Sequence, residues 1–138
     1  MEVFHFIDHL GRGTIHQLLY PLERWSNHHV YSLDSTSSII SLFESIQGAP
    51  CNRIVLHVTG GGGCSITKHI MEKKRDLDNV FIFLHTSLAY QHFKKRDSFI
   101  DQLKVLTDKC HVKILTPSKA CASQFINIGI PASSVQLG

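Results

Sequence analysis

Five consecutive apolar residues, 80–84, form the clearest element of the sequence, and valine, isoleucine and phenylalanine dominate the run. An unbroken run of this kind predicts a parallel strand that is buried on both faces. The run ends at His85, and either Thr86 or Ser87 can cap the helix that the following amphipathic pattern predicts. We therefore expect His85 at the carboxyl end of a central strand, the edge at which open α/β sheets bind ligands.

Apolar, strand-like runs alternate with amphipathic stretches along the whole chain. The strand patterns cover residues 2–8, 29–33, 53–58, 80–84, 112–115 and 135–137. Helical spacing predicts helices over about 15–25, from a cap at 34–36 to Gly48, and over about 65–74, 88–108 and 119–128, the last ended by Gly129. Such alternation predicts an α/β fold, a Rossmann-like three-layer sandwich in which a parallel sheet of about six strands has helices on both faces.

Composition narrows the class of protein. The 138 residues suffice for one domain with its own core. No apolar run approaches the roughly 20 residues of a membrane-spanning helix, and residues 3–7 are too short and too polar for a signal peptide. The net charge of +3 is too small to indicate nucleic-acid binding, and the four cysteines lack C-x-x-C spacing. We expect a single cytoplasmic domain with reduced cysteines and no nucleic-acid partner.

The first glycine loop half matches a dinucleotide-binding fingerprint. Gly11 and Gly13 precede a predicted helix, and Asp34 falls where a ribose-binding acid is expected. The third glycine of the fingerprint is replaced by His16, and the first strand ends several residues before Gly11. The loop can still present backbone N–H groups to a phosphate or sugar phosphate, or its glycines can simply make the turn.

The second glycine loop, residues 59–63, follows the third predicted strand. It is not a P-loop, because Lys68 follows Thr67 instead of preceding a hydroxyl residue. Consecutive glycines, among them Gly60 and Gly61, are typical of a segment whose backbone passes close to a neighbouring group. That neighbour can be a ligand or an adjacent loop.

Ten histidines raise the question of a metal site. The histidines are spread over several predicted elements, so we predict no metal site and expect most of them at the surface or at the edge of the core. His85 is the exception, because its place at a strand end favours a catalytic or ligand-binding role.

The order of these motifs resembles the N-terminal domain of GT-B glycosyltransferases, and most closely the large retaining family 4. The resemblance rests on Leu-Gly-Arg-Gly at 10–13, the glycine loop after the third strand, His-Thr-Ser at 85–87 and Ile-Leu-Thr-Pro-Ser at 114–118. It continues through Gly-Ile-Pro at 129–131 to Ser-Val-Gln-Leu-Gly at 134–138, and so covers almost the whole chain.

The resemblance implies that residues 1–138 are the acceptor-binding half of a two-domain enzyme. A C-terminal domain would bind most of the nucleotide-sugar donor, and the 138 residues alone would be inactive. Toward the donor, the resemblance assigns Gly11, Arg12 and Gly13 to the diphosphate and His85 to the transferred sugar.

On the acceptor side, the resemblance places Thr86, Ser87 and Tyr90, where a sugar, a lipid-linked molecule or another small molecule would bind. No metal or other cofactor is implied, since helix ends and basic side chains can neutralise the leaving diphosphate.

Two basic clusters leave a further choice open. One comprises Lys73, Lys74 and Arg75, and the other comprises Lys94, Lys95 and Arg96. They are typical of solvated helix faces, and they also suit peripheral membrane attachment or an anionic acceptor.

Two other classes of protein compete with the glycosyltransferase. A stand-alone flavodoxin-like module would bind a phosphate or nucleotide without catalysis. A dinucleotide-dependent enzyme domain would use Gly11, Gly13 and Asp34, but His16 argues against it.

Overall fold

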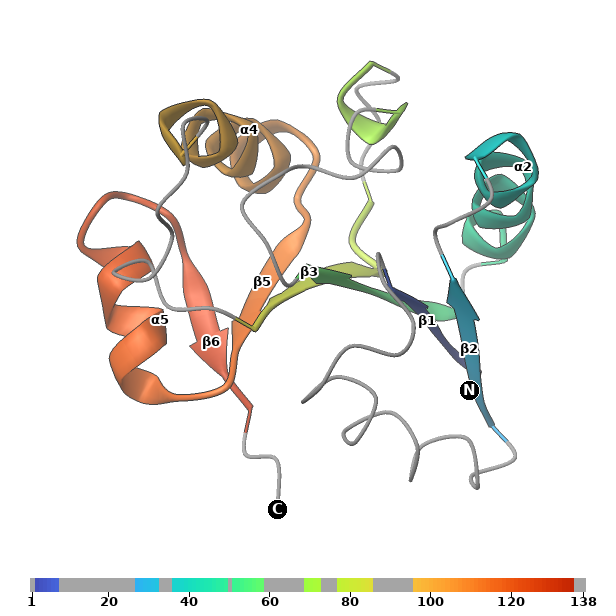
Figure 1. Ribbon diagram of the computed structural model, residues 1–138, viewed down its shortest axis with the longest axis horizontal. Coiled ribbons are helices and arrows are strands. Elements are labelled where there is room, and N and C mark those ends of the chain that lie inside the picture. Colours follow the sequence, from blue (N-terminus) through green and yellow to red (C-terminus); the bar gives the residue numbers. More distant parts are fainter. Residues whose placement is uncertain are drawn as a thin grey trace.

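The computed structural model describes residues 2–7, 27–32, 36–49, 51–58, 69–72, 77–85 and 96–135. Within them, six strands form one sheet in the order β2-β1-β3-β4-β5-β6, and every neighbouring pair is parallel (Figure 1). The strands are β1 (Val3–Ile7), β2 (His28–Ser32), β3 (Arg53–Val58), β4 (Val80–Leu84), β5 (Lys113–Thr116) and β6 (Ala132–Ser134). The prediction of a Rossmann-like α/β fold with a six-stranded parallel sheet is confirmed.

Helices cover the sheet face that carries Phe6. They are α2 (Thr36–Gln47), α4 (Arg96–Lys109), α5 (Lys119–Ile126) and a helical segment at residues 69–72. Figure 1 shows α2 and α4 on the same side of the sheet. Phe43 of α2 meets Phe6 of β1 edge to face, with the ring centroids 6.3 Å apart. The helix predicted over 15–25 lies outside the described residues.

One apolar core joins these helices to the sheet. Its buried side chains come from alternate strand positions and from the inner faces of the helices. The largest that are fully buried are Phe6, Phe43, Phe125, Ile54, Leu56, Ile70, Leu77, Ile82, Leu84 and Leu103. Helix α2 contributes Ile39, Phe43 and Ile46 to this core, which lie on one face of the helix by their spacing. The intervening strand positions face the other side of the sheet.

Several predicted ends were wrong toward the carboxyl end of the chain. The fifth strand runs one residue later than predicted, because Thr116 pairs with Ser134 on β6. The helix after it ends at Ile126 rather than near residue 128, and Gly129, with φ +89°, reverses the chain direction.

The last strand is residues 132–134, whereas the prediction placed it at 135–137. Ladder pairing with β5 selects Ala132, Ser133 and Ser134 despite their weak strand propensity, and Val135 follows the strand. Its backbone N–H still donates a hydrogen bond to the Thr116 carbonyl at 2.8 Å.

Candidate functional site

His85 directly follows β4 at the carboxyl edge of the sheet. Its backbone N–H donates to the carbonyl of Val58 at 3.0 Å, so the pairing of β3 with β4 continues to His85 and fixes its backbone. The predicted place of His85 at a strand end is confirmed. The chain leaves β1 for β2 on one side and returns to β3 on the other, which makes the boundary between β1 and β3 the switch point of the sheet. Open α/β sheets bind ligands at the carboxyl edge beside such a point.

Two aromatic neighbours orient the imidazole of His85. Its Nε2 atom lies 2.8 Å from Nδ1 of His57, and the two rings stack with centroids 5.0 Å apart. The ring of Phe83 stacks on the same imidazole at 4.3 Å. The hydrogen bond and the stacking together restrict the rotamer of His85.

The contact with His57 is the last link of a longer chain of imidazoles. Nε2 of His57 lies 2.9 Å from Nδ1 of His5, and Nε2 of His5 lies 2.9 Å from Nδ1 of His28. We call His28, His5, His57 and His85 the histidine row. It crosses the four strands β2, β1, β3 and β4 in their spatial order.

The strand register explains why these residues meet. His28 lies opposite Val3, two residues before His5, and His57 lies opposite Ile7, two residues after His5. The last step is the same, because His57 lies opposite Phe83 and His85 follows two residues later. Steps of two residues keep every imidazole on the same face. The histidine row therefore runs diagonally, from the first residue of β2 to the residue after β4.

The row is buried in its middle and partly exposed at its ends. His5 is 6% exposed and His57 is 3% exposed, whereas His28 and His85 have intermediate exposure. Burial, reinforced by the neighbouring His28, lowers the pKa of His5 from 6.5 to about 4. Burial also lowers the pKa of His57 well below 6.5, and the neighbouring His85 and His5 act in the same direction. Both inner imidazoles are therefore neutral at pH 7.

Neutral imidazole has one N–H donor and one acceptor nitrogen. His5 and His57 each use both nitrogens inside the row, which satisfies their buried polar atoms. Because all four of these nitrogens are paired, the two histidines are tolerated among apolar strand residues. Chemically, the arrangement provides an oriented imidazole at the carboxyl edge that can donate a hydrogen bond to a ligand hydroxyl or accept one from it.

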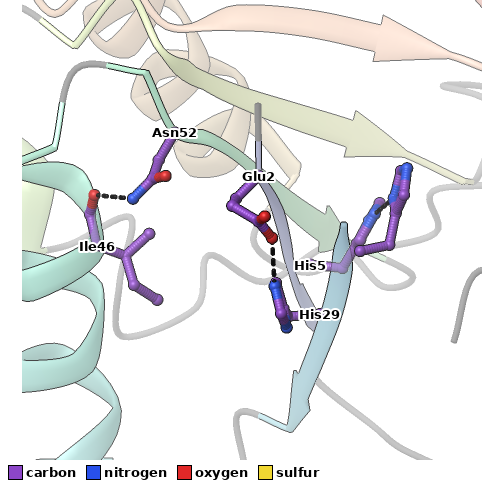
Figure 2. Close-up of polar contacts among 6 residues, drawn as sticks. Glu2, His5, His29, Ile46 and Asn52 are labelled. Atoms are coloured by element: carbon purple, nitrogen blue, oxygen red, sulfur yellow. Dashed lines mark hydrogen bonds and ion pairs between the residues drawn. The ribbon is translucent and has the colours of Figure 1, made fainter. Parts of the chain in front are cut away.

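Other histidines make ordinary pairs with carboxylates. His29 points to the opposite face from His28, and its Nε2 lies 2.6 Å from a carboxylate oxygen of Glu2 (Figure 2). His69 lies 2.5 Å from a carboxylate oxygen of Glu44 and links residues 69–72 to α2. The expectation of surface or core-edge positions holds for His29 but was wrong for His5 and His57, which are buried.

Most residues predicted for the site lie outside the described residues. These are Gly11, Arg12 and Gly13, Gly60 and Gly61, and Thr86, Ser87 and Tyr90. The same is true of Lys73, Lys74, Arg75, Lys94 and Lys95, while only the backbone of Arg96, the first residue of α4, is described. Their predicted roles stay predictions.

Sequence reasoning missed His28, His5 and His57 as partners of His85. A signal was present, because His5 and His57 interrupt strand runs that are otherwise largely apolar. A buried polar residue in such a run needs a partner. The partners could not be named without the register of the strands, which brings together residues that are 23, 52 and 28 positions apart in sequence.

No protein-family model matches the sequence, and searches of curated proteins and of solved structures found no significant match. Among the described helices, none is both long enough and apolar enough to cross a membrane.

Proposed function

We propose that this chain is the acceptor-binding domain of a retaining glycosyltransferase of GT-B architecture, which transfers a sugar from a nucleotide-sugar donor. The observation that carries the proposal is His85, an oriented imidazole at the carboxyl edge of β4 and one strand from the switch point. Sugars are recognised through hydroxyl groups, and a neutral imidazole can donate to a hydroxyl or accept from it. The ordered sequence motifs support the same reading.

In this proposal His85 contacts a hydroxyl of the transferred sugar. His57 is a positioning residue, because it holds Nε2 of His85. Gly11, Arg12 and Gly13 face the donor diphosphate, and Gly60 and Gly61 form a second ligand loop. Thr86, Ser87 and Tyr90 line the acceptor side. A second domain supplies most of the donor contacts, and the enzyme works in the cytoplasm with no metal or cofactor.

The test uses the complete natural polypeptide and variants of it produced recombinantly, since the proposal requires a donor-binding domain. Nucleotide sugars are screened for release of the nucleoside diphosphate and for transfer of labelled sugar to extracted acceptors. His85→Ala should lower transfer by about 10- to 100-fold, the equivalent of one or two lost hydrogen bonds to bound sugar. His29→Ala is the matched control, because His29 lies on the opposite face of the sheet and is 39% exposed.

Two results would overturn the proposal. One is a complete polypeptide that transfers no sugar from any nucleotide-sugar donor. The other is transfer that His85→Ala leaves unchanged, which would remove His85 from the site. Circular dichroism of both variants would establish that each retains the α/β fold.

The strand order supports a second candidate function. The order β2-β1-β3-β4-β5 is also that of flavodoxin-like domains, which bind a phosphate-bearing ligand at the switch point between β1 and β3. A stand-alone binding module of that type would retain flavin mononucleotide or inorganic phosphate in equilibrium dialysis and transfer no sugar. The same transfer screen therefore separates the two candidates.

A further inference from the structure

We propose that the histidine row is a proton relay, which carries protons between the first residue of β2 and His85 at the carboxyl edge of the sheet. The relay consists of the four imidazoles alone and does not depend on which ligand His85 contacts. Figure 2 shows the inner histidine His5 on β1.

The histidine row has a uniform polarity, because all three contacts join the same two kinds of atom. In each contact, Nδ1 of one imidazole faces Nε2 of the next, from His28 through His5 and His57 to His85. Uniform polarity lets the whole row adopt one tautomer. With every Nδ1 protonated, each N–H donates toward His85, and with every Nε2 protonated, each N–H donates toward His28. A mixed row would place two donors or two acceptors against each other at one contact.

The distances fit shared protons rather than a shared metal ion. The three N···N separations are 2.8–2.9 Å, within the range of hydrogen bonds. Two imidazole nitrogens on one tetrahedral zinc ion would be separated by about 3.3 Å, given a Zn–N distance of about 2.0 Å. Among the described residues, no group of three or more histidine, cysteine or acidic side chains is arranged to hold a metal ion.

The surroundings of the row favour the transfer of a proton along it over the retention of an extra proton on its inner imidazoles. Burial keeps the pKa of both His5 and His57 below 6.5, so neither holds an extra proton at pH 7. On the described parts of β1, β2, β3 and β4, the face that carries the row has no carboxylate. Among these strand residues, Arg53 at the start of β3 is the charged residue on the same face.

Each transfer conserves protons. A proton that binds Nε2 of His28 releases the Nδ1 proton of that ring to Nε2 of His5. His5 then passes its own Nδ1 proton to Nε2 of His57, and His57 passes its Nδ1 proton to Nε2 of His85. Nδ1 of His85 finally gives its proton to an acceptor. One proton enters and one leaves, and every ring changes from the Nδ1–H to the Nε2–H tautomer. The reverse sequence restores the first state.

Imidazole nitrogen NMR tests the relay in the 138-residue chain without substrate. The chain is labelled with [15N]histidine, and relaxation dispersion is recorded at pH 7. A relay predicts that His28, His5, His57 and His85 exchange between the two tautomers with one common rate. His28→Gln should remove that common exchange at His85, although His28 lies three strands away. His29→Gln, its neighbour on the opposite face, should leave the exchange unchanged.

The opposite results would overturn the relay. They are four fixed tautomers without exchange, four unrelated exchange rates, or exchange at His85 that His28→Gln does not alter. If His28→Gln perturbs folding, His5→Gln provides the same interruption at the next ring, and circular dichroism monitors the fold. Because no sugar or nucleotide is present, failure of the glycosyltransferase proposal would not affect this result.

Discussion

Acidification should destabilise the protein well above the pH at which carboxylates titrate. His5 titrates at about 6.5 in the unfolded chain and at about 4 in the folded chain, because burial disfavours its charged form. The unfolded chain therefore binds a proton between these values that the folded chain does not bind. The contribution of His5 to the free energy of unfolding is fully present above pH 6.5, and it is lost as the pH falls from 6.5 toward 4.

The magnitude follows from the same two pKa values. At pH 5, protonation stabilises the unfolded imidazole of His5 by RT ln(1 + 10^1.5), which is about 2 kcal/mol, and leaves the folded imidazole almost unprotonated. Moving from pH 7 to pH 5 should thus remove about 2 kcal/mol through His5 alone. The pKa of His57 is also lowered by burial, so His57 adds to the loss of stability.

Urea unfolding at intervals between pH 7 and pH 5, followed by circular dichroism, measures this loss as a falling midpoint at constant m-value. His5→Gln should flatten the dependence, because it removes one of the two buried groups. A wild-type stability that varies by less than about 0.5 kcal/mol over this range would refute the argument that His5 and His57 are buried in their neutral forms.

Three further substitutions test the packing and the caps by urea unfolding at pH 7. His57→Ala should cost about 3 kcal/mol or more, because it opens a cavity and removes the hydrogen-bond partner of both His5 and His85; a loss below about 1 kcal/mol would contradict the buried row. Gly129→Ala should cost about 1 kcal/mol through its φ of +89° alone, since nothing lies within 4 Å of the added Cβ. In the control Gly48→Ala, the added Cβ meets only ordinary contacts at 3.5 Å and 3.7 Å, so this substitution should not destabilise the protein. Ser118→Ala should cost about 1 kcal/mol, because the Ser118 hydroxyl accepts from the Cys121 N–H at 3.2 Å at the start of α5, and an unchanged midpoint would remove this cap from the account.

The sequence predicted the central strands best. β3 and β4 have the predicted bounds, because short segments rich in valine, isoleucine, leucine and phenylalanine favour a strand that is largely buried. β6 was misplaced because its residues, Ala132 to Ser134, have little intrinsic strand preference, and the exposed edge of β5 decides which residues pair. Local pattern thus decides the strands at the centre, and tertiary pairing decides the strand at the edge.

Of the four histidines of the row, only His85 could be predicted from the sequence as a site residue. His85 was found because a strand end can be recognised locally from the change between an apolar run and hydroxyl residues. The partners of His85 could not be found in that way, because they are selected by the register of three strand pairs. A shift of one residue in any of these pairings would turn an imidazole to the opposite face.

The two faces of the same strands differ in a way that argues for function on one of them. On the Phe6 face, β3 and β4 contribute a continuous apolar core, as stability alone would favour. On the other face, His5 and His57 occupy positions where valine or isoleucine would bury without any hydrogen-bond requirement. Each imidazole there is satisfied only through its neighbours, so the row is stable as a set and fragile to the loss of one member. Departures from the simplest packing are expected at functional sites. The face of the histidine row, ending at His85, is therefore where the chemistry of this protein should be sought.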